Sequence, residues 1–200
     1  MSAGGRTIVN EYSATKRRAV DDFWTTQAPC THCLQLYDSD EALLDALEGF
    51  IATGIRQGDA IVVIATPSHR LELDRRLAYA GFDPAAAAER GQYLPLDAAE
   101  LLARFTDNGV PDEARFRCVI DGLLLRARKH YPTVRAFGEM VGLLWADGHY
   151  ASTARLEEMW SRVCHDNNLA LFCAYPRAGF DAAPAFAAQI EAAHSQACPF

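Results

Sequence analysis

The chain has 200 residues, half of them hydrophobic and 22% charged, which is enough for one domain with a hydrophobic core. Its 19 basic and 26 acidic residues leave a net charge of −7, so we expect no general affinity for nucleic acid or for an anionic membrane surface. No apolar run reaches the length of a membrane span, and the N-terminus lacks the apolar centre of a secretory signal, which predicts a cytoplasmic protein.

Residues 1–28 are polar and show little apolar periodicity, which predicts a flexible N-terminal leader. From residue 29 onward, short apolar runs alternate with longer helical patterns, and the sequence shows neither a repeat nor an internal linker. We therefore expect residues 29–200 to form a single domain.

Short apolar runs in this second region predict five strands. The run from Ala60 to Thr66 is continuous and rich in β-branched residues, which is typical of a strand buried on both faces of a sheet. Helical periodicity fills the intervals between the runs. The predicted strands are Cys33–Tyr37, Ala60–Thr66, Gln92–Leu96, Thr133–Met140 and Leu169–Pro176. The predicted helices cover residues 38–57, 67–80, 98–105, 112–130, 150–167 and 182–194.

The alternation of strands and helices predicts an α/β fold with a mostly parallel central sheet of about five or more strands and helices on both faces. Ligands of such sheets bind outside the carboxyl ends of the strands. Side chains that end the predicted strands are therefore candidates for a binding site. They are Tyr37, Asp38, Thr66, Glu139, Met140 and Tyr175.

Glu139 is the most informative of these residues, because a carboxylate at the end of a buried strand is costly unless it is paired or used. One interpretation is an ion pair with an arginine such as Arg135 or Arg177. The other is a polar anchor in a ligand cleft, which the position at a strand end favours.

Three further residues lie in apolar patterns of the C-terminal half. Trp145 is either part of the core or one wall of an apolar pocket. Glu157 shares a helix face with Trp160 and is predicted to be a surface or helix-pairing charge. Cys173 lies in the last predicted strand and is predicted to be a core thiol.

The sequence lacks the motifs that mark common catalytic and nucleotide sites. It contains no GxxxxGK[ST] phosphate loop, no GxGxxG after a strand, no GxSxG and no HExxH. Without a phosphate loop, tight nucleotide binding has no visible means. No nucleophile, base and metal ligands can be assembled either, so we expect no catalytic residues, no cofactor and no enzymatic activity. An enzyme that uses His32 and Glu139 as acid and base is the alternative.

The segment CTHC places Cys30 and Cys33 ahead of the first predicted strand. A redox-active pair has its first thiol at a helix N-terminus, whose dipole lowers the thiol pKa, whereas this pair precedes a strand. A second interpretation is half of a zinc site, which His32, His194 and Cys198 could complete. The third is a pair of partly packed thiols at the start of a strand.

Two blocks carry a resemblance to a known family. HCLQLYDSDEALLDALEGFIATGIRQGDAIVVIAT (32–66) and FGEMVGLLWADGHYASTARLEEMWSRV (137–163) resemble the MEDS family, the methanogen/methylotroph DcmR sensory domain, over about residues 30–197. The family usually shows His-x-Cys at the first strand, whereas here Cys33 follows His32 and Leu34 stands at the expected cysteine position. The matching positions are His32, Tyr37, Asp38, Ser39, Asp40, Glu41, Phe50, Gly54, Gly58, Asp59, Gly138, Glu139, Met140, Leu144, Trp145, Gly148, Leu156, Glu157 and Trp160.

The resemblance implies a degenerate RecA-like fold of the circadian-clock ATPase type that has lost its phosphate loop. It also implies a non-enzymatic sensory domain that binds a small, mostly apolar molecule of the hydrocarbon-derivative class. The signal would pass to a separate histidine kinase or transcriptional regulator.

For this role we expect a closed apolar pocket at the carboxyl ends of the strands, without direct contact to nucleic acid or membrane. A homodimer is a further assembly that we consider. The predicted ligand-binding residues are His32, Tyr37, Asp38, Thr66, Glu139, Met140, Trp145 and Tyr175.

Two alternative functions remain open from the sequence. One is a ligand-free protein that regulates a histidine kinase. The other is a thiol- or metal-responsive sensor with zinc as its cofactor and ligands from both ends of the chain. The residues of that alternative are Cys30, His32, Cys33, His194 and Cys198.

Overall fold

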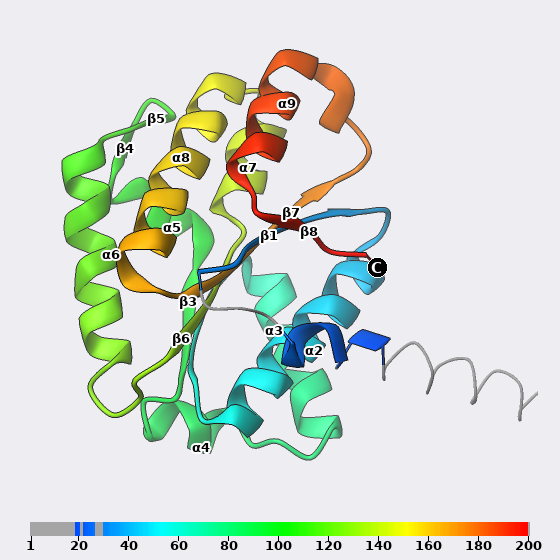
Figure 1. The fold of residues 1–200 in the computed structure, drawn as a ribbon, viewed down its shortest axis with the longest axis vertical. Helices are drawn as coiled ribbons and strands as arrows, with labels where there is room; N and C mark the ends of the chain where they lie inside the picture. The colour runs from blue at the N-terminus through cyan, green and yellow to red at the C-terminus, as the bar shows by residue number, and fades with distance from the viewer. Residues whose placement is uncertain (1–18, 21, 27–29, 200) are drawn as a thin grey trace, which may run out of the picture.

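A computed structural model of the chain describes residues 19–20, 22–26 and 30–199 (Figure 1). Six strands of this part form one sheet, in which every neighbouring pair is parallel and the order is β3-β2-β6-β7-β1-β8. The predicted α/β fold with a parallel sheet is therefore confirmed. The strands are β1 (His32–Tyr37), β2 (Ala60–Ala65), β3 (Tyr93–Asp97), β6 (Val134–Gly138), β7 (Ala170–Pro176) and β8 (Gln196–Ala197).

Helices cover both faces of the sheet and give the protein three layers (Figure 1). One face carries α2 (Asp40–Gln57), α3 (Pro67–Tyr79) and α4 (Pro84–Glu89). The other face carries α5 (Ala98–Ala103), α6 (Glu113–Ala127), α7 (Met140–Ala146), α8 (Tyr150–Asn167) and α9 (Pro184–Ala193). Among the helices of the described residues, none is both long and apolar enough to cross a bilayer.

The central strand β2 shows why the sheet is buried on both sides. Each of its six residues is buried, as its continuous apolar run predicts. Val62 and Ile64 face the core under α5–α9, whereas Ile61 and Val63 face the core under α2–α4. One short sequence therefore contributes to two hydrophobic cores, because successive strand residues point to opposite faces.

The structure adds short elements that the sequence did not predict. β8 pairs with β1 through the Ser195 N–H, which donates to His32 O at 2.9 Å, and the Cys198 N–H, which donates to Leu34 O at 2.7 Å. A strand of two residues is too short to show a periodic pattern, so β8 left no signal. The others are the short helices α4 and α7, a hairpin of β4 (Thr106–Asp107) and β5 (Val110–Pro111), and a 3₁₀ turn, η1 (Phe180–Ala182).

Part of the predicted leader packs against α2. Val20 and Trp24 are only 4% and 1% exposed. The Trp24 ring lies 4.8 Å from the ring of Phe50 and 5.0 Å from that of Phe172, measured between centroids. The leader therefore supplies side chains to the core, and the domain boundary at residue 29 stays a prediction. Outside the described part of the chain lie residues 1–18, 21 and 27–28 of the leader, together with residues 29 and 200.

A buried ion pair joins the end of α2 to the start of β6. The Arg135 side chain donates from Nε to Asp59 Oδ2 at 2.7 Å and from Nη1 to Trp24 O at 3.2 Å. Gly54 makes room for it, because a Cβ at this position would lie 2.7 Å from Arg135 Cδ and 2.5 Å from Ile61 Cδ1. Two of the positions that carry the family resemblance, Gly54 and Asp59, therefore serve packing.

This close approach predicts that Gly54→Ala lowers the free energy of unfolding by about 1–3 kcal/mol, the usual cost of overpacking a core. Gly122→Ala in α6 is the matched control, because nothing lies within 4 Å of its added Cβ. Helix propensity then raises the stability of the control by about 0.5–1 kcal/mol. Urea unfolding of both variants measures the difference, and equal effects at the two positions would contradict the packing argument.

Candidate functional site

Alternation along β1 and β7 brings several polar side chains to one face of the sheet. His32 and Leu34 point towards α8 and α9, whereas Cys33 between them points towards α2. β7 lies beside β1 in parallel register, and its Cys173 and Tyr175 point to the same face as His32. The polar side chains of two adjacent strands therefore meet under α8 and α9.

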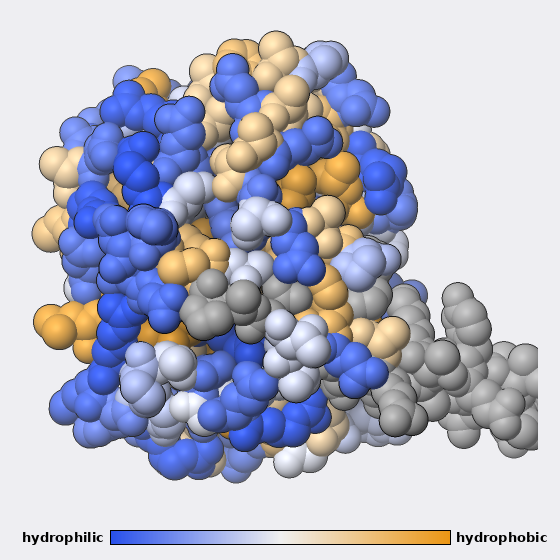
Figure 2. Space-filling view, viewed as in Figure 1, coloured by the Kyte–Doolittle hydropathy of each residue, from blue (hydrophilic) through white to orange (hydrophobic). Residues whose placement is uncertain are grey.

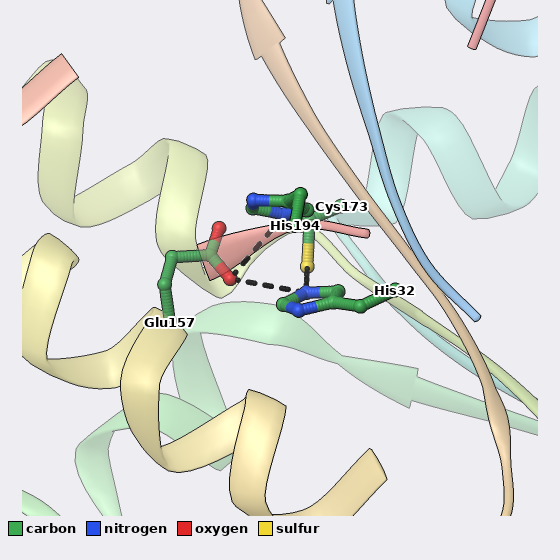
Figure 3. A group of neighbouring side chains, drawn as sticks. All are labelled: His32, Glu157, Cys173 and His194. Atoms are coloured by element: carbon green, nitrogen blue, oxygen red, sulfur yellow. Dashed lines mark hydrogen bonds and ion pairs between the residues drawn. The ribbon is translucent and has the colours of Figure 1, made fainter. Parts of the chain in front are cut away.

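Four side chains from four elements form a group that we call the buried cluster (Figure 3). They are His32 of β1, Glu157 of α8, Cys173 of β7 and His194, the residue that ends α9. One nitrogen, oxygen or sulfur atom from each lies within 4.8 Å of the others. His32 Nε2 is 3.3 Å from Glu157 Oε2 and 3.4 Å from Cys173 Sγ. His194 Nε2 is 3.7 Å from the same Glu157 oxygen.

Hydrogen bonds outside the buried cluster assign the tautomers of both imidazoles. His194 Nδ1 lies 2.6 Å from Ile190 O, which can only accept, so Nδ1 carries the proton. His32 Nδ1 lies 3.0 Å from Ser161 Oγ and 3.2 Å from Ala193 O. Because the Ser161 hydroxyl donates to Ala193 O at 2.8 Å, His32 Nδ1 is again the donor. In the neutral rings both Nε2 atoms therefore present lone pairs to the cluster.

Glu157 is the centre of this group. Its side chain is fully buried, and its Oε1 accepts a hydrogen bond from the Tyr175 hydroxyl. Its Oε2 accepts no hydrogen bond from any described residue. Burial works to raise the pKa of Glu157, but His194, His32 and the Tyr175 hydroxyl outweigh it and lower that pKa to about 2.

The groups around Glu157 differ in how they hold protons. Burial, with the Glu157 charge reinforcing it, raises the pKa of both Cys173 and Tyr175, so thiol and phenol stay protonated at neutral pH. Burial lowers the pKa of His194, which disfavours a positive charge on that ring. The cluster therefore holds an ionised carboxylate 3.7 Å from the imidazole of His194, a ring whose burial disfavours protonation.

A second group of polar side chains lies at the carboxyl ends of β2 and β6. Glu139 follows β6 and caps α7, so the strand predicted for residues 133–140 ends earlier, at Gly138. Glu139 Oε2 accepts the Thr66 backbone N–H at 2.7 Å. Its Oε1 lies 2.8 Å from His69 Nδ1. Thr66 and Glu139, both predicted site residues, are thus brought together with a histidine that sequence reasoning missed.

The two arginines considered as partners of Glu139 pair elsewhere. Arg135 binds Asp59 at 2.7 Å, and Arg177 binds Asp38 at 3.0 Å. Glu139 is therefore held by a backbone N–H and an imidazole instead of a guanidinium.

The other predicted residues at the strand ends have different surroundings. Burial, followed by the charges of Glu139 and Asp40, raises the pKa of Tyr37 to about 12, so this phenol lies near the Glu139 group and stays protonated. Asp38 forms its ion pair at the surface. Met140 is fully buried in the core under α5–α9.

Trp145 belongs to an aromatic group over the end of β7. Its ring centroid lies 6.0 Å from that of Tyr175 and 5.1 Å from that of Phe180, and its Nε1 donates to Gly179 O at 3.2 Å. Trp145 is 5% exposed and Tyr175 is fully buried. These rings fill the space between α7, β7 and η1 with one another.

The zinc set considered from the sequence is divided between the two faces of the sheet. His32 and His194 meet in the buried cluster. Cys33 is buried on the α2 side, where Cys198 packs against the same core. Cys30 contacts the loop that follows α8. Adjacent strand residues point to opposite faces, which is why His32 and Cys33 cannot face one ion together.

A pocket of about 550 Å³ lies between α9 and the edge of the sheet formed by β1 and β8, and it is open to solvent on one side. Its apolar wall includes Leu34 and Leu36. His194 belongs both to the lining of the pocket and to the buried cluster. Figure 2 shows hydrophobic side chains gathered beside α9, over the carboxyl ends of β1 and β7, within a mostly hydrophilic surface. The residues around the pocket are Leu34, Leu36, Arg177, Glu191, His194, Ser195, Gln196, Ala197, Cys198 and Pro199.

Sequence reasoning missed the two central members of the buried cluster. Glu157 was predicted to be a surface charge, but it is fully buried. Its helix did carry a signal, because Glu157 is the charged residue in a buried stripe that also contains Thr153, Trp160 and Cys164. Cys173 is buried as predicted, but the apolar run of its strand does not indicate that its thiol faces polar side chains.

Comparisons with known proteins agree with the fold. The family model described as MEDS, MEthanogen/methylotroph, DcmR Sensory domain, matches residues 31–195. Among solved structures, one described as a structural study of a Pyrococcus horikoshii OT3 protein matches with a TM-score of 0.56 and 12% sequence identity. The match covers 89% of this chain and 85% of the other, and at this identity it shows the fold alone. No curated protein matches the chain.

The contact between His69 and Glu139 predicts a pH-dependent contribution to stability. The hydrogen bond to Glu139 raises the pKa of His69 above its ordinary value of 6.5, against the opposing effect of burial. The stabilisation is therefore complete below about pH 6.5 and is lost as the pH rises through the raised pKa. We expect the difference in unfolding free energy between the unaltered protein and His69→Gln to be largest below about pH 6.5, measured by urea unfolding.

The same pair of proteins in a Glu139→Gln background provides the control, because the raised pKa depends on that carboxylate. There the pH-dependent difference should become smaller, because Asp40, whose Oδ1 lies 3.6 Å from His69 Nε2, still acts to raise the pKa of His69. A difference that stays constant, or that grows as the pH rises, would show that His69 is not stabilised by the carboxylate.

Proposed function

Because the chain belongs to the MEDS family of sensory domains, we propose that it is a non-enzymatic sensor that binds a small molecule and passes the signal to a separate protein. The proposed ligand is a mostly apolar hydrocarbon derivative with one polar group. The pocket between α9 and the β1–β8 edge carries this proposal, because its volume of about 550 Å³ lies in the range of small-molecule sites.

The lining of the pocket supports this ligand chemistry. Leu34 and Leu36 contribute alternate residues of β1 and form an apolar wall. Ser195, Gln196, Arg177 and Glu191 add polar and charged groups to the lining. A hydrocarbon part can pack on the leucines while one polar group binds to the side chains beside β8.

The pocket also touches the element that can change when a ligand binds. Ser195 lines the pocket, and its backbone N–H donates to His32 O while its Oγ accepts the His32 N–H at 2.9 Å. Cys198, at the other end of β8, donates to Leu34 O. These few hydrogen bonds hold β8 on the sheet edge. We propose that an occupied pocket stabilises the docked state of β8, which is the change that a partner protein detects.

We propose a histidine kinase or a transcriptional regulator as the receiving protein. The sensory family supports this role, and the net charge of −7 argues against direct binding to nucleic acid. Of the residues predicted for the ligand site, His32 and Tyr175 connect to the pocket through Glu157 and His194. The Glu139 group lies at a different part of the sheet and has no role in this proposal.

Straight-chain primary alcohols from methanol to octanol test the pocket. We expect binding to strengthen by about 0.8 kcal/mol for each added CH₂ until the apolar wall is covered, measured by isothermal titration calorimetry. Ala197→Trp should abolish binding, because the indole fills the pocket beside β8. Ala78→Trp, at an exposed position of α3 on the other face of the sheet, is the matched control and should bind normally.

Binding that does not strengthen with chain length, or that survives unchanged in Ala197→Trp, would show that this pocket is not the ligand site. An interaction protein without a ligand would then be the better description of the chain.

Hydrogen exchange tests the signalling step. With the tightest-binding alcohol of the series present, the Ser195 and Cys198 amides should exchange more slowly, because the docked state of β8 is more populated. The Ile61 amide, which donates to Gln92 O at 2.7 Å on the far side of the sheet, is the internal control and should not change. If the Ser195 and Cys198 amides exchange at an unchanged rate, or if only the Ile61 amide exchanges more slowly, the signal does not act through β8.

A further inference from the structure

The buried cluster brings together more hydrogen-bond acceptors than its own protons can satisfy. Both imidazoles give their Nδ1 protons away from the cluster, so the Nε2 lone pairs of His32 and His194 face Glu157 Oε2 at 3.3 and 3.7 Å. Within the described part of the chain, neither Glu157 Oε2 nor His194 Nε2 has a hydrogen-bond partner. The Cys173 thiol has one proton and can serve only one of these acceptors.

An unpartnered carboxylate oxygen at full burial is among the most costly groups in a protein interior. The elements around it leave little room for it to turn away, because the Tyr175 hydroxyl holds its other oxygen. A single cation between the four side chains would compensate all of these groups at once.

We propose that the buried cluster is a binding site for one divalent transition-metal ion, with Zn²⁺ the best match. The four ligand atoms are His32 Nε2, His194 Nε2, Glu157 Oε2 and Cys173 Sγ. Imidazole, thiolate and carboxylate are the ligands that Zn²⁺ takes in proteins, whereas Ca²⁺ and Mg²⁺ require oxygen ligands.

The distances fit a tetrahedral ion. Bonds of about 2.0–2.3 Å hold tetrahedral ligand atoms about 3.3–3.8 Å apart. The contacts of His32 Nε2 with Glu157 Oε2 and Cys173 Sγ are 3.3 and 3.4 Å, and that of His194 Nε2 with the same oxygen is 3.7 Å. The remaining separations are within 4.8 Å, so small side-chain adjustments bring all four atoms onto one ion.

Outer hydrogen bonds orient the ligands as they do in known metal sites. A metal-binding histidine usually donates its second N–H to a carbonyl or carboxylate, and His194 does so to Ile190 O. His32 donates towards Ser161 and Ala193 O. The Tyr175 hydroxyl occupies Glu157 Oε1 and leaves Oε2 for the ion.

The charges also balance. When the ion binds, Cys173 loses its proton to solvent and becomes a thiolate, so one thiolate and one carboxylate neutralise one divalent cation. The two neutral imidazoles add no charge. A site with no net charge is the form best suited to full burial.

This site differs from the zinc set that the sequence suggested. It keeps His32 and His194 and replaces three cysteines at the chain ends by Glu157 and Cys173. It does not depend on the hydrocarbon ligand, because Ala197→Trp should abolish alcohol binding and leave metal binding intact. Failure of either proposal can therefore be recognised separately.

Titration of the whole chain with Co²⁺, after removal of metal by a chelator, tests the proposal. We expect one equivalent of Co²⁺ to give the intense visible bands of tetrahedral coordination and a near-ultraviolet thiolate-to-metal charge-transfer band. Zn²⁺ should displace the Co²⁺ and remove both signals, because this ligand set binds Zn²⁺ more tightly.

Variants identify the ligands. Cys173→Ser should abolish the charge-transfer band, and Glu157→Gln should weaken binding by more than the roughly 10–100-fold that an outer-shell change costs. Tyr175→Phe removes only the support of Glu157 and should weaken binding by about 10–100-fold. Cys164→Ser, a buried thiol of α8 that bonds to Leu169 O, is the matched control and should keep both signals.

Absence of a charge-transfer band in the unaltered protein, or its survival in Cys173→Ser, would overturn the proposal. Should Cys173→Ser fail to fold, single serine variants of Cys30, Cys33, Cys118 and Cys198, together with Cys164→Ser, decide the matter by elimination. If all five keep the band, Cys173 is the ligand. If any one loses it, the site is elsewhere.

Discussion

A carboxylate with no access to water requires compensation from its surroundings, and Glu157 places that requirement in the middle of the core under α5–α9. Its partners come from β1, β7 and the end of α9, so one charged group joins a strand near the start of the chain to the last helix. Few other arrangements of these elements could satisfy it. The cluster therefore restricts how α8 and α9 sit on the sheet.

Much of the fold could be predicted from the sequence because its signals are local. The continuous apolar run of β2 and the helical periodicity of α8 fixed the type of each element within a few residues. The strand order required contacts between distant segments, and β8 was too short to leave a pattern. The added strand forms one wall of the pocket in which we propose that the ligand binds.

The candidate site was harder to predict, and the reason is the alternation of side chains along strands. The zinc alternative placed His194 near His32, and the two rings do lie 3.9 Å apart between centroids, but Cys33 points to the opposite face of β1. The thiol that meets the histidines belongs to β7, whose position beside β1 no local pattern reveals. Glu157 could have been found, since a charge inside a buried helical stripe needs an explanation. Glu139 was found because it ends a buried strand, yet its partner is His69 and not an arginine.

The resemblance to the family covers positions with two different physical roles. Gly54 and Asp59 allow and complete the buried Arg135 pair, so they maintain the packing of α2 on β6. His32 and Glu157 belong to the buried cluster, where a purely structural role would be served more cheaply by apolar side chains. A matching position alone does not distinguish these roles, whereas the surroundings of each side chain do.

The place of β1 in the sheet has a consequence for biosynthesis. Its two neighbours, β7 and β8, are the last strands of the chain, so β1 leaves the ribosome long before either of them exists. During translation its hydrogen-bonding edges and the His32 side chain stay without their final contacts while β2, β3 and β6 can already pair. The nascent protein therefore carries an unpaired strand until β7 and β8 have been synthesised, and chaperones that shield exposed strands should engage it during this interval.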